Sequence, residues 1–239
     1  MAVGLFAFLG IRPYQPWILW LTAVLAGLAV DGIVRASPRW PGHGIFGSIV
    51  YVLLPALAVL GAGFFIDHAI NGYARLGAAL VPAGSAGLIA WAEYQTVDIE
   101  SRRYGTMRLA LAVATYLAAF ALYTVIFTNH LSLVAGTVCT GLVSMALGLE
   151  LLRETRPLGP SALLVALAIG VSLAELRLAL YFFPLDGLLA GALLIIGFYL
   201  ATGIVHHLLD HDLEWATTAE YLLVAVVGTA AVVVTRVAV

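Results

Sequence analysis

Eight apolar stretches of about 20 residues recur along this chain, and they constrain its fold more than any other feature. A membrane-crossing helix needs about 20 mostly apolar residues, because in lipid its backbone groups must be hydrogen bonded within the segment. The chain is 63% hydrophobic and 10% charged, whereas soluble domains carry about 25% charged residues. The sequence therefore predicts an all-α, polytopic transmembrane helical bundle of about eight spans. The expected spans are Trp17–Val34, Ile45–Ile66, Tyr73–Trp91, Met107–Phe127, Ser132–Leu152, Ser161–Phe183, Gly187–His206 and Trp215–Val234.

The connections between these stretches are short, and none resembles a linker or a soluble domain. We therefore expect residues 1–239 to form a single transmembrane helical domain. Met1–Gly10 is apolar but no positive segment precedes it and no small-residue cleavage site follows it, so we expect a retained, short interfacial helix.

Arginine placement predicts the orientation of the chain in the membrane. Cytoplasmic loops carry an excess of basic residues. With both termini on one side, that side holds three arginines and the other side holds seven, excluding Arg177 within a span. The sequence predicts an integral protein, in a bacterial inner membrane, with both termini on the non-cytoplasmic side.

Composition and motifs exclude several functions. The formal net charge of -2 gives no basis for a nucleic-acid partner. No Gly-rich phosphate loop or GxSxG motif occurs, and no Lys is present to hold retinal. The expected partners are the lipid bilayer and either other membrane subunits or further copies of this chain.

Helix packing leaves a clear signal in the fifth span. Gly136, Thr140, Ser144 and Gly148 recur at every fourth position, and small residues at this spacing let two helices approach closely. Pro55 and Pro82 lie inside the second and third spans, where each removes a backbone donor and predicts a kink.

Ionisable and polar residues cluster where several expected spans end on the non-cytoplasmic side. A charged group at membrane depth is costly, so each is a candidate for function. The candidate substrate or polar-site residues are Glu175, Arg177, His68, Asp67, His130, Asn129, Tyr181 and Asp186.

Glu175 and Arg177 cannot both face the bundle, because residues two apart are about 200° apart around a helix. Glu175 shares a face with small residues such as Ala168 and Ser172, so we expect it to point into the bundle. We expect Arg177 to extend toward the membrane surface. Glu175 is then protonated or partnered by His68, His130 or Arg75.

A second candidate site lies near the end of the seventh span. His207 and His211 are four residues apart and share a helical face if the helix continues, so both imidazoles can bind one metal ion. Asp210 is one step off this face and can orient one of them only after a bend in the helix. The metal would be zinc or iron, but HxxxH alone is a weak signal, and the alternative is a solvated acidic loop with no cofactor.

Several short motifs in the second half resemble a known family. They are Arg108–Leu111 with Tyr116–Phe120, Leu149–Arg153, Glu175 with Phe183–Gly187, and Phe198-Tyr199 before His206 and His207. Over about half of the chain these resemble an uncharacterised family of bacterial membrane proteins with about eight helices and no assigned function. The resemblance implies a fold and a bacterial source but no activity.

Three classes of function follow from the sequence. The first is non-catalytic binding or transport of a small or lipid-like molecule at the Glu175 cluster. The second is a structural or accessory subunit of a larger membrane complex. The third is a membrane-embedded metal-dependent enzyme that uses His207 and His211. No motif assigns an enzymatic activity.

Overall fold

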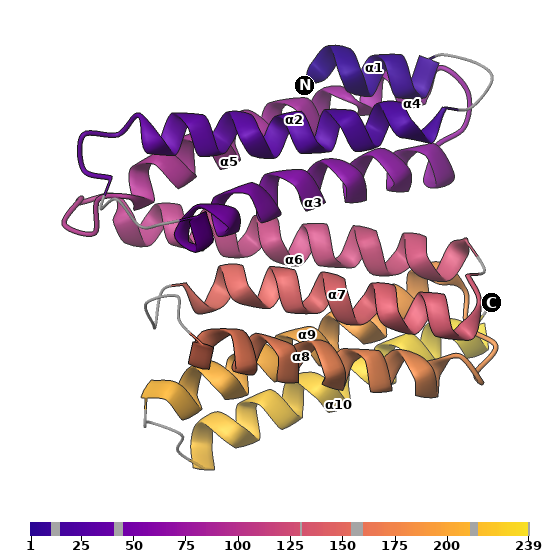
Figure 1. Cartoon of the computed structure of the whole chain (residues 1–239). Helices are drawn as coiled ribbons and strands as arrows, with labels where there is room; N and C mark the ends of the chain where they lie inside the picture. Colours follow the sequence, from indigo (N-terminus) through magenta and orange to yellow (C-terminus); the bar gives the residue numbers. More distant parts are fainter. Residues whose placement is uncertain (11–14, 41–44, 130, 154–159, 211–214, 239) are drawn as a thin grey trace. The chain divides into compact units, whose positions relative to one another are not determined.

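The computed structural model describes residues 1–10, 15–40, 45–129, 131–153, 160–210 and 215–238. These residues are almost entirely helical (Figure 1). The helices are α1 (Ala2–Gly10), α2 (Pro16–Arg35), α3 (Ile45–Ala69), α4 (Ala74–Ala78), α5 (Leu80–Thr96), α6 (Tyr104–Thr128), α7 (Leu133–Leu152), α8 (Pro160–Leu180), α9 (Gly187–Asp210) and α10 (Trp215–Ala238).

Eight helical segments in the described part of the chain are long and apolar enough to cross a membrane. They correspond one to one with the spans expected from the sequence, so the all-α polytopic fold class is confirmed. The third segment runs on to Thr96, five residues past its expected end at Trp91. Hydropathy predicts too early an end for this helix, because Glu93 is a charged residue type and yet is fully buried.

Pro82 explains why the third segment consists of two helices. A proline cannot donate to the carbonyl four residues earlier and its ring clashes with it, and that carbonyl belongs to Ala78. Helix α4 ends at Ala78 and α5 begins at Leu80. Pro55, in contrast, lies inside the continuous helix α3, and the kink expected there stays a prediction.

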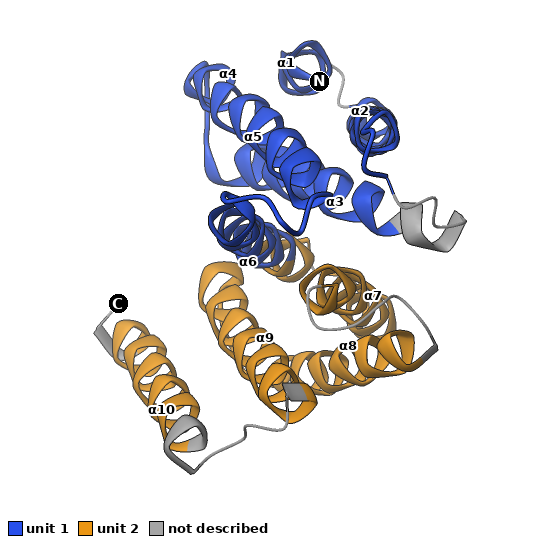
Figure 2. Cartoon of the chain, turned by 90° about the vertical axis from the view of Figure 1, so that its left-hand side faces the viewer, with its two compact units in different colours: residues 1–122 blue, residues 123–239 orange. Residues whose placement is uncertain are grey.

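The chain divides into two compact units, Met1–Leu122 and Tyr123–Val239 (Figure 2). Helix α6 contributes residues to both. The single domain expected from the sequence stays a prediction.

Unit 1 is organised around the pair α2 and α3. The expected N-terminal helix is present as α1, and its Leu5, Phe8 and Leu9 are buried. Phe8 meets Phe64 of α3 edge to face, with ring centroids 5.9 Å apart, a favoured geometry for aromatic pairs. One face of α1 is therefore part of the core of unit 1.

Unit 2 is organised around the contact between α7 and α8. The small residues Gly136, Thr140, Ser144 and Gly148 are all buried, which confirms the packing face expected from their spacing. The backbones meet closely: a Cβ added to Gly170 would lie 2.7 Å from the carbonyl oxygen of Gly141. Only glycine fits at this crossing.

This crossing gives a test of the packing. Gly170→Ala should lower the free energy of unfolding by about 1–3 kcal/mol, because the added methyl group meets backbone that cannot move aside cheaply. Unfolding of the purified protein in mixed detergent micelles measures the change. Gly84→Ala is the control, since nothing lies within 4 Å of a Cβ at Gly84; equal stability of the two variants would contradict the close packing.

Candidate functional site

Arg177 lies on the buried face of α8. Ala166, Ile169, Leu173 and Leu180 share that face and are buried, at the three- and four-residue spacing of one helical stripe. Arg177 itself is only 2% exposed. The expectation that it extends to the membrane surface is therefore wrong. Packing against α7 fixes the rotation of α8, and this rotation carries Arg177 inward.

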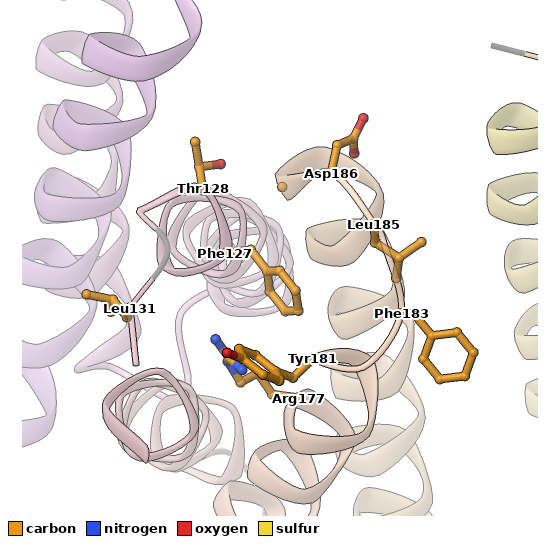
Figure 3. A pocket seen from close by; sticks show the side chains of 9 residues that line it. Phe127, Thr128, Leu131, Arg177, Tyr181, Phe183, Leu185 and Asp186 are labelled. Atoms are coloured by element: carbon orange, nitrogen blue, oxygen red, sulfur yellow. The ribbon is translucent and has the colours of Figure 1, made fainter. Parts of the chain in front are cut away.

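The guanidinium group of Arg177 fits because α7 has no side chain at Gly136. A Cβ at that position would overlap the guanidinium. The ring of Phe127 lies 4.8 Å from Cζ of Arg177, and the ring of Tyr181 lies 5.3 Å from it. Contacts of this kind between a cation and an aromatic ring are attractive, by about 2 kcal/mol when desolvated. Figure 3 shows both rings beside the arginine.

The charge of Arg177 is not neutralised within the described part of the chain. Its Nε and Nη1 atoms are buried and form no hydrogen bond with a described residue. No described carboxylate forms an ion pair with it either. An unpaired buried charge costs several kcal/mol, and the aromatic contacts offset only part of this cost.

Arg177 lines a partly open cavity of about 410 Å³. The cavity lies where α6 and α8 end and α9 begins, and Figure 3 shows its walls. Pockets that bind small molecules have volumes of about 300–1,000 Å³. The lining residues are Phe127, Thr128, Leu131, Arg177, Tyr181, Phe183, Leu185, Asp186 and Gly187.

Asp186 is the acidic residue of this cavity. Its Oδ1 atom accepts a hydrogen bond of 2.7 Å from the backbone N–H of Leu189, so the side chain caps the first turn of α9. Figure 3 shows its carboxylate pointing away from Arg177. Asp186 therefore stabilises α9 and leaves Arg177 uncompensated.

A hydrogen-bonded ladder supports the α7 face that receives Arg177. Ser144 donates to the carbonyl of Thr140 at 2.7 Å, and Thr140 donates to the carbonyl of Gly136 at 2.9 Å. The Tyr123 hydroxyl lies 2.7 Å from Ser144 Oγ, and it is the donor because the Ser144 proton is already used. The ladder links α6 to α7 and ends at Gly136, directly beside the guanidinium.

Glu175 does not lie where the sequence predicted. It is exposed, as are Ala168, Ser172 and Ala179 on the same face of α8. The small residues of this face suggested close packing, but α8 meets α7 through Ile169, Gly170 and Ala174 instead. Glu175 is therefore outside the Arg177 cavity.

The remaining sequence candidates divide between the two units. In unit 1, Asp67 forms an ion pair with Arg75 at 3.6 Å, and His68 Nδ1 lies 2.9 Å from the carbonyl oxygen of Phe64. In unit 2, the Asn129 amide donates to the carbonyl of Val125 at 2.8 Å. Tyr181 and Asp186 share the cavity with Arg177, while His130 lies outside the described residues.

A smaller cavity in unit 1 provides a useful contrast. It has a volume of about 290 Å³ and includes Arg75 in its lining. Here the arginine is paired with Asp67, so its charge is compensated within the chain. Of these two cavities, only the one at Arg177 has a lining arginine without an ion-pair partner among the described residues.

The predicted metal site falls mostly outside the described residues. His211 and the side chain of Asp210 are among the undescribed groups. The His206 and His207 rings are 5.9 Å apart, and the His207 and Tyr221 rings are 5.8 Å apart. The described part of the chain contains no cluster of three metal-ligating residues, and the metal site stays a prediction.

The fold and the cavity define a polytopic helical membrane protein with an internal arginine that faces a ligand-sized space. The chain belongs to the family described as "Protein of unknown function (DUF5656)", which it matches over residues 3–235. This confirms the resemblance seen in the sequence and extends it to nearly the whole chain. No curated protein and no solved structure matches the chain.

The unpaired charge predicts an unusual stability effect. Arg177→Met should raise the free energy of unfolding of the ligand-free protein by about 1–4 kcal/mol, because methionine fills similar space without a buried charge. Thermal unfolding in detergent after removal of bound lipid measures this change.

Arg153→Met is the matched control for that substitution. Arg153 forms an ion pair of 3.1 Å with Glu150, which is 1% exposed. Its replacement should destabilise the protein by leaving a buried carboxylate without this partner. A loss of stability in Arg177→Met as large as that in Arg153→Met would show that Arg177 is a structural residue.

Proposed function

We propose that this protein binds, without catalysis, a small or lipid-like molecule that carries an anionic group, in the cavity lined by Arg177. One observation carries the proposal: the Arg177 guanidinium is buried, unpaired among the described residues, and part of the wall of a 410 Å³ cavity. An anionic ligand compensates the charge that the chain leaves unsatisfied.

The chemistry of arginine specifies the kind of anion. A guanidinium presents a planar fork of donors that matches a carboxylate or phosphate group with two parallel hydrogen bonds. In Arg177, Nε and Nη1 are buried and form no hydrogen bond with a described residue, so the described part of the chain uses neither of these donors. The apolar wall formed by Leu131, Leu185 and Phe127 favours a ligand with an apolar part beside its charged group.

The location of the protein follows from the same arginine count as before. We propose that it is an integral protein of a bacterial inner membrane, and the arginine count supports an orientation with both termini on the non-cytoplasmic side. The cavity lies between the end of α6 and the start of α9, so it opens on that same side. Ligands reach it from the outer leaflet or from the aqueous space beyond. A flux assay in vesicles distinguishes transport from binding alone.

The proposal predicts that bound anion is lost with the charge of Arg177. The wild-type protein should purify in mild detergent with about one small molecule or lipid that carries a carboxylate or phosphate group per chain, and Arg177→Gln should lose it. Arg177→Lys should retain part of it, because lysine keeps the charge without the planar fork. Native mass spectrometry and analysis of extracted lipids measure occupancy.

Glu175→Gln is the control in the same experiment. It removes a charge from the same helix, two residues from Arg177, but outside the cavity. Its occupancy should equal that of the wild type. Equal occupancy in Arg177→Gln and the wild type would refute the proposed function.

A second candidate function is supported by the exposed face of α8. A carboxylate at the lipid-facing surface of a span is costly, and Glu175 lies there among Ala168, Ser172 and Ala179. Small residues around a polar one favour contact with another helix. This arrangement suits an accessory subunit whose partner covers Glu175.

Co-purification tests this second function. If Glu175 binds a partner helix, the wild-type protein should migrate as a larger assembly in mild detergent. Glu175→Leu should reduce the assembly to the single chain. A wild-type protein that runs as a monodisperse monomer would exclude the subunit function.

A further inference from the structure

Asp186 gives the cavity a second charged residue type, and together with Arg177 it selects a class of ligand. The identity of this ligand class rests on the proposed function, because it requires an anionic group bound at Arg177. We infer that the ligand is zwitterionic, with its anionic group at Arg177 and its cationic group at Asp186.

The two charges balance within the lining of the cavity. Among the described lining residues, Arg177 is the basic one and Asp186 is the acidic one. A ligand with two negative charges would gain from Arg177 but be repelled by Asp186. A zwitterion is attracted by both, so charge complementarity favours it over a dianion.

Asp186 has capacity for a second interaction. Its Oδ1 atom accepts from the backbone N–H of Leu189, but an ionised carboxylate has two oxygens and about four acceptor sites. The residue is exposed, and no ion pair joins it to a described cation. Arg236 donates to the carbonyl of Pro184, two residues before Asp186, and is not part of the lining.

Exposed aromatic side chains also line the cavity. Tyr181 is 47% exposed and Phe183 is 61% exposed, and both line the cavity. Aromatic rings attract ammonium groups, including quaternary ones. Figure 3 shows Phe183 well away from Arg177, so its ring does not compete for that guanidinium.

Two sources can supply this chemistry. One is a phospholipid with an ethanolamine or choline headgroup, which the position of the cavity at the ends of the spans favours. The other is a free, water-soluble zwitterion. Both place a phosphate or carboxylate and an ammonium group in one molecule, and both satisfy the inference.

The test compares lipids that differ in headgroup charge. Full-length protein is purified, stripped of lipid, and titrated with dioleoyl phosphatidylethanolamine, phosphatidylcholine, phosphatidylglycerol and phosphatidic acid. The free headgroups glycerophosphoethanolamine and glycerophosphoglycerol form a second arm. The wild type should bind phosphatidylethanolamine about tenfold more tightly than phosphatidylglycerol, and glycerophosphoethanolamine about tenfold more tightly than glycerophosphoglycerol. One additional charge pair allows a difference of this size.

Asp186→Asn removes the charge and keeps the helix cap, because asparagine caps helices as well as aspartate does. It should abolish the preference for zwitterionic over anionic lipids, while Glu175→Gln keeps it. The affinity in Asp186→Asn for phosphatidylglycerol should rise to that for phosphatidylethanolamine.

The outcomes separate this inference from the proposed function. If the wild type prefers phosphatidylglycerol or phosphatidic acid and Arg177→Gln abolishes binding, the anion site stands and the zwitterion is refuted. If Arg177→Gln binds every probe as the wild type does, both are refuted. Preference for the zwitterion in either the lipid or the headgroup arm, lost in Asp186→Asn, supports the inference.

Discussion

The cost of burying one uncompensated guanidinium group is the constraint on which our account of this protein depends. Arg177 is held inside unit 2 because Gly136 leaves space for it and because Phe127 and Tyr181 pack against it. Two other arginines are neutralised by acids: Arg35 by Asp31 at 2.8 Å and Arg153 by Glu150 at 3.1 Å. Since an unpaired buried charge is destabilising, the proposed function assigns the missing compensation to a ligand.

The fold was largely predictable from the sequence, because the signals that define it are local. A run of about 20 apolar residues specifies a span wherever it occurs, and the four-residue repeat of small residues from Gly136 to Gly148 specifies a packing face. The break at Ala79 was predictable in position, since Pro82 disrupts the turn before it. The exact end of the third span was not, because Glu93 is buried in spite of its charge.

The candidate site was predictable only in part. Tyr181, Asp186 and Arg177 were correctly singled out as polar residues near the same helix ends, but Arg177 and Glu175 were assigned to the wrong faces of α8. Two signals pointed the other way: Leu173 and Leu180 lie on the Arg177 face, and no acid stands three or four residues from Arg177 to neutralise it. The rest of the cavity is formed by the end of α6, the segment after it, and the turn before α9. These segments are far apart in the chain, so no local sequence pattern predicts the cavity.

An experimental structure of the full-length protein, purified in mild detergent without added ligand, tests the central claim most directly. Our account predicts density for a bound molecule in the cavity, within hydrogen-bonding distance of the guanidinium group of Arg177. An empty cavity, with the guanidinium paired instead to a carboxylate of the chain, would contradict it and leave Arg177 as a structural residue.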